Sequence, residues 1–182
     1  MAYELSDFCK DCRDAVAGHA DPSAEILERV RMHLAKLLAN QTFTERTCGP
    51  DAPAGLHLLH EDGPLGFQVL AHVNQKARVS PPHNHGLSWA VYGQVTGYTD
   101  MTEYRRIDDG SDPTHARLEV IRSYRLNPGD VGVYVRGVIH SIDYPPGSRF
   151  IRITGTNLDR IERDAFDLAT GEIRRPALQQ AT

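Results

Sequence analysis

Two stretches of the chain carry histidines at spacings that suit a metal ion. The first, PPHNHGLSWAVYGQVTG from 81 to 97, places His83 and His85 two residues apart behind a proline pair. The second, NPGDVGVYVRGVIHSIDY from 127 to 144, places His140 in an alternating apolar run. Side chains two apart on a strand project to the same side, so His83 and His85 are predicted to share a face with His140 on a neighbouring strand.

The chemistry of three imidazoles narrows the metal and its use. Imidazole nitrogens suit iron, zinc, copper and nickel better than magnesium or calcium, which prefer oxygen ligands. Three protein ligands rather than four leave positions open for water, substrate or oxygen, as in catalytic metal sites. The sequence therefore predicts a catalytic metal on these histidines. The alternative is three hydrogen-bonded polar residues in a metal-free barrel.

The elements that must position these histidines change character near residue 42. Before it, apolar residues recur at helical spacing, most clearly from Ile26 to Leu38. After it, short alternating runs such as GLHLLHE, VGVYV and RFIRITGT are separated by turn signals such as EDGP and YPPGS. Many short strands with regular turns predict a sandwich or small barrel. We predict one domain, with two helices in 1–42 packed on a barrel spanning 43–182.

Composition limits the partners and the compartment. The formal net charge is -4, and the 20 basic residues are scattered, which argues against a nucleic-acid or anionic-membrane partner. The first residues lack the pattern of a secretory leader, and no apolar run approaches the ~20 residues of a membrane helix. Three cysteines cannot all pair, which fits a reducing cytoplasm, so a cytoplasmic location is expected.

Cys9 and Cys12 form a C-x-x-C pattern that two kinds of structure can explain. A zinc or redox motif would need a second cysteine pair or a turn at a strand-to-helix junction, and the remaining cysteine, Cys48, is isolated. Phe8 and Val16 recur with the two cysteines at helical spacing. The pattern therefore predicts two buried thiols on one apolar helix face, where free cysteine behaves as a small hydrophobe.

Together, the two histidine stretches resemble the motifs of the cupin superfamily, a double-stranded β-helix or jelly-roll barrel. The matching positions are His83, His85 and Gly97 in the first motif and Gly129, Gly137 and His140 in the second. Val135 stands where the second motif has proline. The resemblance covers roughly residues 43 to 165 and implies a mainly β, jelly-roll fold.

The glutamate that serves many cupins as a fourth ligand is absent, because its position falls at Trp89 or Ala90. An all-histidine cupin is similar to the cysteine and thiol dioxygenase branch, which holds Fe(II) with three histidines. That resemblance implies a mononuclear non-haem iron dioxygenase that takes O2 and a small thiol and forms a sulfinate. Zn, Mn and Ni remain open as alternatives for the same ligands.

Around the substrate, the residues differ from that branch. Cysteine dioxygenases place an arginine on an early strand to pair with the substrate carboxylate, and His57 falls there in this chain. The family's late-strand Ser-x-His-x-Tyr is replaced by Arg152, Thr154 and Thr156. Free cysteine is therefore not the expected substrate.

A substrate pocket is predicted from these comparisons and from strand facing. Its residues are Arg152, Trp89, Tyr98, His57 and Thr154. Arg152 faces either solvent or the barrel lumen, and in the lumen its guanidinium could bind a substrate carboxylate. Asp100 and Glu103 are its candidate partners within the chain. Trp89 is equally explained as a core aromatic, and His57 as a surface or hydrogen-bonded residue.

Other functions stay open for the same histidines. One is a three-histidine cupin that cleaves diketone-like substrates or acts as a metal-dependent lyase or isomerase. Another is a non-catalytic module that holds a metal or small ligand. In each case the expected partner is a small molecule, with O2 for the dioxygenases, and the sequence is compatible with a homo-oligomer.

Overall fold

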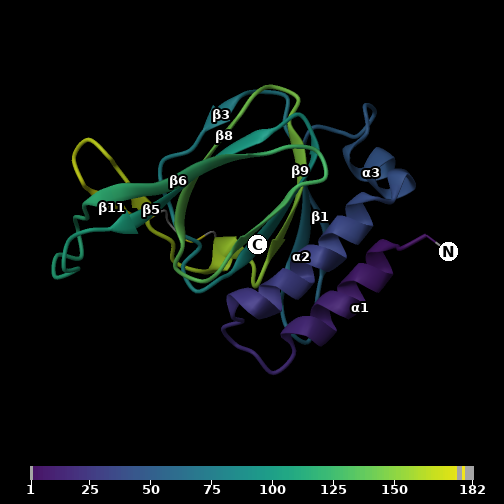
Figure 1. The fold of residues 1–182 in the computed structure, drawn as a ribbon, viewed down its shortest axis with the longest axis horizontal. Coiled ribbons are helices and arrows are strands. Elements are labelled where there is room, and N and C mark those ends of the chain that lie inside the picture. Colours follow the sequence, from purple (N-terminus) through teal and green to yellow (C-terminus); the bar gives the residue numbers. More distant parts are fainter. Residues whose placement is uncertain (1, 176–177, 179–182) are drawn as a thin grey trace.

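Two antiparallel sheets face each other in the computed structural model, which describes residues 2–175 and 178, and three helices lie against one of the sheets (Figure 1). The first sheet has the order β1 (Gly55–Glu61), β2 (Gln68–Val73), β9 (Arg149–Thr154), β4 (Ala90–Thr96) and β7 (Val131–Tyr134). The second has the order β3 (Arg78–Val79), β8 (Ile139–Tyr144), β5 (Thr99–Arg106) and β6 (Leu118–Leu126). The expectation of a mainly β, jelly-roll barrel is confirmed.

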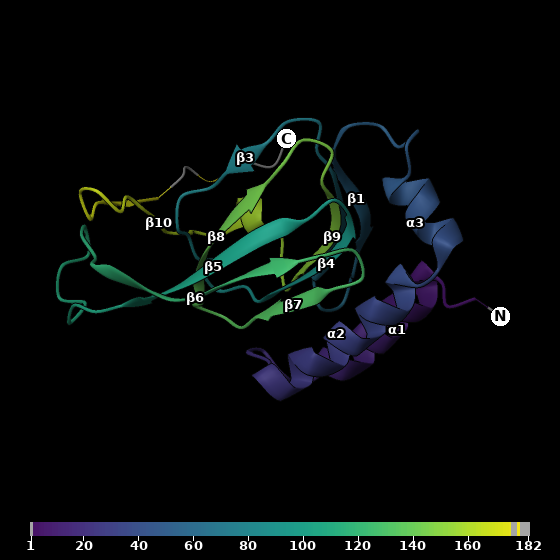
Figure 2. The ribbon, with the colours of Figure 1, turned by 45° about the horizontal axis from the view of Figure 1, so that its top comes forward.

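Beyond the two sheets lies a short hairpin of β10 (Ala165–Phe166) and β11 (Ile173–Arg174), preceded by a 3-10 turn at Leu158–Arg160. Figure 2 shows this hairpin and the far ends of β5 and β6 projecting from the barrel on the side away from the helices. Sequence patterns missed β3, β10 and β11, because two residues are too few for alternation to register.

The helical segment is longer than predicted. It contains α1 (Leu5–Val16), α2 (Ala24–Leu38) and α3 (Gln41–Cys48), and α3 crosses the boundary expected at residue 42. The side chain of Asn40 starts α3 by accepting a hydrogen bond from the Phe43 amide at 3.1 Å. An eight-residue helix with a single turn of buried residues is too short to give a clear apolar stripe. No described helix is long and apolar enough to span a membrane.

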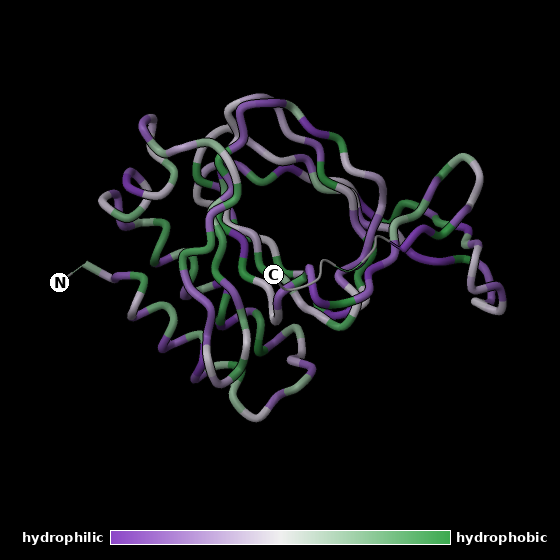
Figure 3. Tube along the Cα trace, turned by 180° about the vertical axis from the view of Figure 1, so that it is seen from behind, coloured by the Kyte–Doolittle hydropathy of each residue, from purple (hydrophilic) through white to green (hydrophobic). Residues whose placement is uncertain are grey.

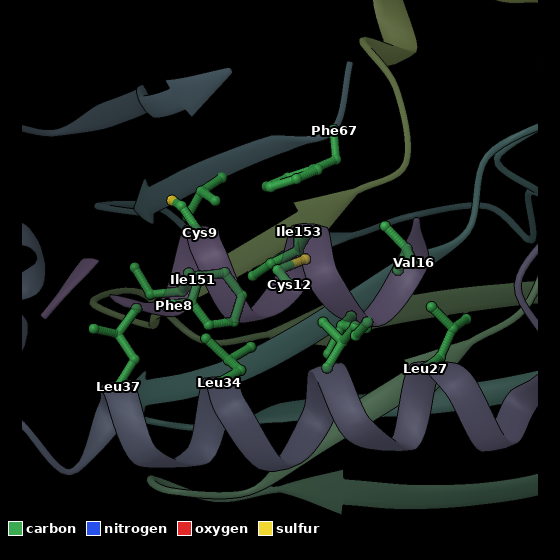
Figure 4. Close-up of a cluster of buried hydrophobic side chains, with 14 of the residues drawn as sticks. Phe8, Cys9, Cys12, Val16, Leu27, Leu34, Leu37, Phe67, Ile151 and Ile153 are labelled. Atoms are coloured by element: carbon green, nitrogen blue, oxygen red, sulfur yellow. The ribbon is translucent and has the colours of Figure 1, made fainter. Parts of the chain in front are cut away.

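The outer face of the first sheet carries the most extensive of the apolar clusters among the described residues, and a smaller one lies inside the barrel. Figure 4 shows Ile151 and Ile153 of β9 among the side chains of α1 and α2. Cys9 and Cys12 lie in this layer, buried as predicted, and burial raises the pKa of the Cys9 thiol to about 11. Helix α2 can approach β4 closely at Gly93, where an added Cβ would lie 2.7 Å from Leu38.

The inner face of the same sheet has a different composition. Because side chains alternate along a strand, the neighbours of Ile151 and Ile153 point into the barrel, and they are Phe150, Arg152 and Thr154. Figure 3 shows this mixing as hydrophilic and hydrophobic residues that follow one another along the strands. Arg152, one of the polar members of the inner face, lines a cavity together with His83 and His85.

Candidate metal centre

The structure brings the three predicted histidines together. One ring nitrogen from each of His83, His85 and His140 lies within 4.8 Å of the others. His83 and His140 are joined across the two segments by a pair of backbone hydrogen bonds, each 2.9 Å long. Ring centroids are 4.7 Å apart for His83 and His140 and 4.9 Å for His85 and His140. The alternation and spacing of the two motifs therefore predicted this cluster correctly.

Each histidine has a different second contact. Nδ1 of His83 lies 3.0 Å from the Pro81 carbonyl, which can only accept a hydrogen bond, so Nδ1 carries the proton and Nε2 is free as a ligand atom. Nε2 of His85 lies 3.4 Å from the Tyr92 hydroxyl. Neither ring nitrogen of the fully buried His140 has a partner within the described residues. Buried polar atoms rarely stay unpaired, so His140 fits a bound ion.

Burial also keeps these imidazoles neutral, as ligand atoms must be. It lowers the pKa of His140 to about 3, and it lowers the pKa of His83 and, more strongly, of His85. Nearby imidazoles add to the effect on His85 and His140. Three neutral nitrogen donors without a carboxylate can hold a divalent metal ion of the transition series.

Beside the cluster lies a cavity of about 370 Å³, a size that suits a small molecule. His83 and His85 form part of its wall. Arg152 also lines it, so of the two orientations that the sequence left open for this arginine, the structure has the lumen-facing one. Thr154 points to the same interior from the same strand but is fully buried, does not line the cavity, and has no hydrogen-bond partner for Oγ1 among the described side chains.

Three other predicted pocket residues lie elsewhere. Trp89 belongs to the apolar layer beneath the helices, which is the core alternative. His57 faces away from the cavity, because alternation turns its neighbour Leu56 inward, and its Nε2 bonds to the Pro53 carbonyl at 2.7 Å. Tyr98 precedes β5 and stacks under the Arg125 guanidinium, 3.6 Å from the ring centroid. The pocket predictions for these three residues were wrong.

Sequence reasoning missed other residues of the cavity wall, namely His72, Tyr92 and Arg163. The His72 ring stacks on Phe150 at 4.4 Å, and its buried Nε2 has no partner in the described part of the chain. Burial, with Arg152 and Arg78 nearby, holds the pKa of His72 well below its usual range. Alternation in QVLAHV indicated two faces for this strand but not which face is inside.

Behind His140, a hydrogen-bonded network holds the second sheet. Tyr134 packs its ring 4.7 Å from the His140 ring, and its hydroxyl lies 2.9 Å from that of Tyr124. Tyr124 donates to Glu103 at 2.8 Å, and Arg122 donates to the same carboxylate oxygen at 2.7 Å. Glu103 is thereby committed to the network rather than to Arg152.

Asp100, the other candidate partner of Arg152, is also occupied. It points out of the barrel and accepts two hydrogen bonds from Arg125, at 2.7 and 2.8 Å. The side chains of β5 that point into the barrel are those of Thr99, Met101 and Glu103. Neither expected carboxylate therefore reaches the guanidinium of Arg152.

No protein-family model matches the chain, and no curated protein does so. Among solved structures, KdgF from Halomonas sp. is 16% identical over 54% of this chain and 76% of its own, with a TM-score of 0.40. The Schizosaccharomyces pombe Cnp3 cupin domain is 13% identical over 59% and 66%, with a TM-score of 0.44. A cupin superfamily protein from Desulfitobacterium hafniense is 17% identical over 59% and 84%, with a TM-score of 0.40. At such identities, function has to be argued from the site itself.

Proposed function

We propose that this protein is a mononuclear non-haem iron dioxygenase that oxidises a small thiol-containing substrate to a sulfinate. The observation that carries the proposal is the set of three neutral imidazoles, of which His83 and His85 line a small cavity, without a carboxylate as a fourth ligand. Such a set leaves coordination positions for two small molecules. It also matches the three-histidine resemblance to the thiol dioxygenases in the sequence.

Each residue of the site would have a distinct role in the proposed reaction. His83, His85 and His140 would hold the ion, and the contact of His83 Nδ1 with the Pro81 carbonyl leaves Nε2 of His83 available as the ligand atom. An Fe(II) ion held there would offer sites for a thiolate and for O2 and would pass electrons from sulfur to oxygen, so that a thiolate and O2 give a sulfinate with no other reductant. The cavity wall would orient the rest of the substrate and exclude bulk water. The Tyr92 hydroxyl, beside His85, is a hydrogen-bonding group for a bound ligand.

Free L-cysteine is expected to be a poor substrate. His57 occupies the position at which cysteine dioxygenases carry an arginine, and its side chain faces away from the cavity. The wall that remains combines arginines with neutral imidazoles, so it offers little to an ammonium group. Oxygen-electrode assays on iron-loaded protein with a panel of thiols test this. Fastest turnover with L-cysteine would contradict it.

The same assay tests the proposed reaction. Oxygen uptake should depend on both iron and a thiol, and mass spectrometry should find a product heavier by two oxygen atoms. A matched pair of variants controls for contaminating iron: His140→Ala should lose the activity, and His57→Ala should keep it. Iron-loaded protein that consumes no oxygen with any thiol would reject the proposal. A zinc- or manganese-loaded preparation active as a lyase would favour the alternative.

A further inference from the structure

The cavity beside the histidines carries more positive charge than the described residues of its wall neutralise. Arg78, Arg152 and Arg163 all line it. Within the described residues, Arg152 makes no hydrogen bond or ion pair, and its Nε is buried without a partner. Arg163 has a single distant partner, Asp159, at 3.8 Å. A guanidinium removed from water is unfavourable unless an anion meets it.

The two carboxylates at the cavity leave this charge in place. Asp164 is bound from outside the cavity by Arg175 at 2.9 Å, and it accepts a hydrogen bond from Asn84 at 3.2 Å. Asp159 is about half exposed and lies toward Arg163, not Arg152. The histidines of the wall are neutral, so they offset nothing. Three guanidiniums therefore face a space in which one carboxylate is already paired elsewhere.

From this charge arrangement, we infer that the cavity is a binding site for small organic anions, that it prefers dianions to monoanions, and that it disfavours molecules carrying an ammonium group. Arg152, from β9, and Arg163, from the segment after the 3-10 turn, provide two separate guanidiniums, each able to take a carboxylate through paired N–H donors. The neutral, unpartnered Nε2 of His72 adds a hydrogen-bonding atom on the same wall.

Anion binding is inferred from the arginines alone, and the inference rests on the proposed function only in taking the anion to be the thiol substrate. The substrate class would then be mercapto acids without an amino group, preferably with two acidic groups. Charge attraction in a partly closed cavity also concentrates such molecules before they bind. An ammonium group would meet three guanidiniums and, among the described residues of the wall, two carboxylates that each already have an arginine partner.

Binding of sulfur-free probes tests the inference without relying on turnover. Four-carbon molecules that differ in charge form a matched series: succinate, butyrate, 4-aminobutyrate and butylamine. Isothermal titration calorimetry on the metal-loaded protein, repeated after metal removal because carboxylates also bind metals, should give tightest binding for succinate. Butyrate should bind roughly tenfold more weakly, and 4-aminobutyrate more weakly still. Equal affinity for butyrate and 4-aminobutyrate would overturn the inference.

A pair of arginine variants assigns the effect to the cavity. Arg152→Gln should weaken succinate binding by roughly ten- to a hundredfold. Arg160→Gln removes the same charge from the neighbouring turn, where the side chain is exposed and outside the cavity wall, and should change binding less than about threefold. Circular dichroism and thermal melts confirm folding of both variants. Equal losses in the two variants would show general charge attraction and overturn the inference.

The result of the binding experiment can be distinguished from the result of the oxygen-uptake assay. Charge-ordered binding of the probes without oxygen uptake on any thiol would retain the anion site and reject the dioxygenase. Oxygen uptake that is fastest with a zwitterionic or cationic thiol, together with no preference among the probes, would retain the dioxygenase and reject the anion site.

Discussion

The two faces of the first sheet share five strands and have opposite chemistry. On its outer face, Ile151 and Ile153 are fully buried against α1 and α2, and the layer is apolar. On its inner face, Arg152 and Thr154, from the same strand, leave polar atoms without partners. Five of the six buried side-chain atoms that lack partners in the described residues belong to the barrel interior, on His72, His140, Arg152 and Thr154. Alternate residues of β9 therefore have different roles: those that point outward pack in the apolar layer, and those that point inward present polar groups to the interior.

The unpaired polar atoms of the inner face indicate where a ligand could bind. Unpaired buried polar groups destabilise a fold, and native proteins contain few of them. Their concentration beside the histidines and the cavity supports the proposal that a metal and an anion bind in the interior. On the outer face, the described residues include one such atom, Nε2 of His60. Substitutions on the two faces should therefore act on different measurements.

The largest effect is expected on the inner side, from His140→Ala. Two imidazoles rarely retain a divalent ion against water and buffer, so the metal content should fall from about one ion per chain to nearly none. Elemental analysis of the purified, folded variant measures this. His57→Ala, which removes a histidine that faces away from the cavity, should keep the full metal content. A full complement in His140→Ala would show that His140 is not a ligand.

The next largest effect is expected on the outer face, from Ile153→Ala. Truncation of a fully buried isoleucine should lower the free energy of unfolding by about 2–5 kcal/mol, because it loses transfer energy and leaves a cavity. Urea unfolding measures this, and metal bound per folded chain should be unchanged. Leu58→Ala, at a leucine that is 54% exposed, should cost less than about 0.5 kcal/mol. Loss of metal by folded Ile153→Ala would contradict the separation of the two faces.

A smaller effect should appear as pH dependence of the metal-free protein. Burial lowers the pKa of His72, His83, His85 and His140, so the unfolded chain binds more protons than the native protein below about pH 6.5. The stability from these histidines is complete above about pH 6.5. It is lost as pH falls, by roughly 1.4 kcal/mol per pH unit for each histidine that stays neutral in the native state.

Urea unfolding between about pH 6.5 and 5 isolates this contribution, because most carboxylates titrate lower. The His140→Ala variant should show a slope shallower by roughly 1.4 kcal/mol per pH unit, since His140 keeps its depressed pKa of about 3 in the native state. Equal slopes for the variant and the wild type would mean that His140 charges in the native protein.

The smallest effect, and one of opposite sign, is expected for Arg152→Met. Without its ligand, the Arg152→Met variant gives up a half-buried cation whose Nε has no partner among the described residues, so its free energy of unfolding should be unchanged or should rise by about 1 kcal/mol. Arg149→Met on the same strand is the matched control. Arg149 donates to the carbonyls of Cys48 and Gly49, so its loss should destabilise the protein. Equal destabilisation by the two variants would mean that Arg152 has a partner in solution.

Local sequence signals were sufficient for the strands and for the histidine cluster. Alternation over runs of four or more residues depends only on the two-residue period of a strand, so it located β1 at Gly55–Glu61 as observed. The three histidines were predictable because their two motifs carry the spacing and facing in the chain itself. The paired cysteines of α1 followed in the same way from helical spacing.

The cavity wall depended on tertiary structure. Alternation divides a strand into two faces but does not say which face is inside, and so Tyr98 and His57 were assigned to the wrong side while His72 was missed. The pairing of β2 and β4 with β9 sets His72 opposite Phe150 and Tyr92 opposite Arg152, across separations of about sixty to eighty residues in the chain. Such contacts arise from the packing of the sheets against each other and against the helices, and no local pattern of residues encodes them.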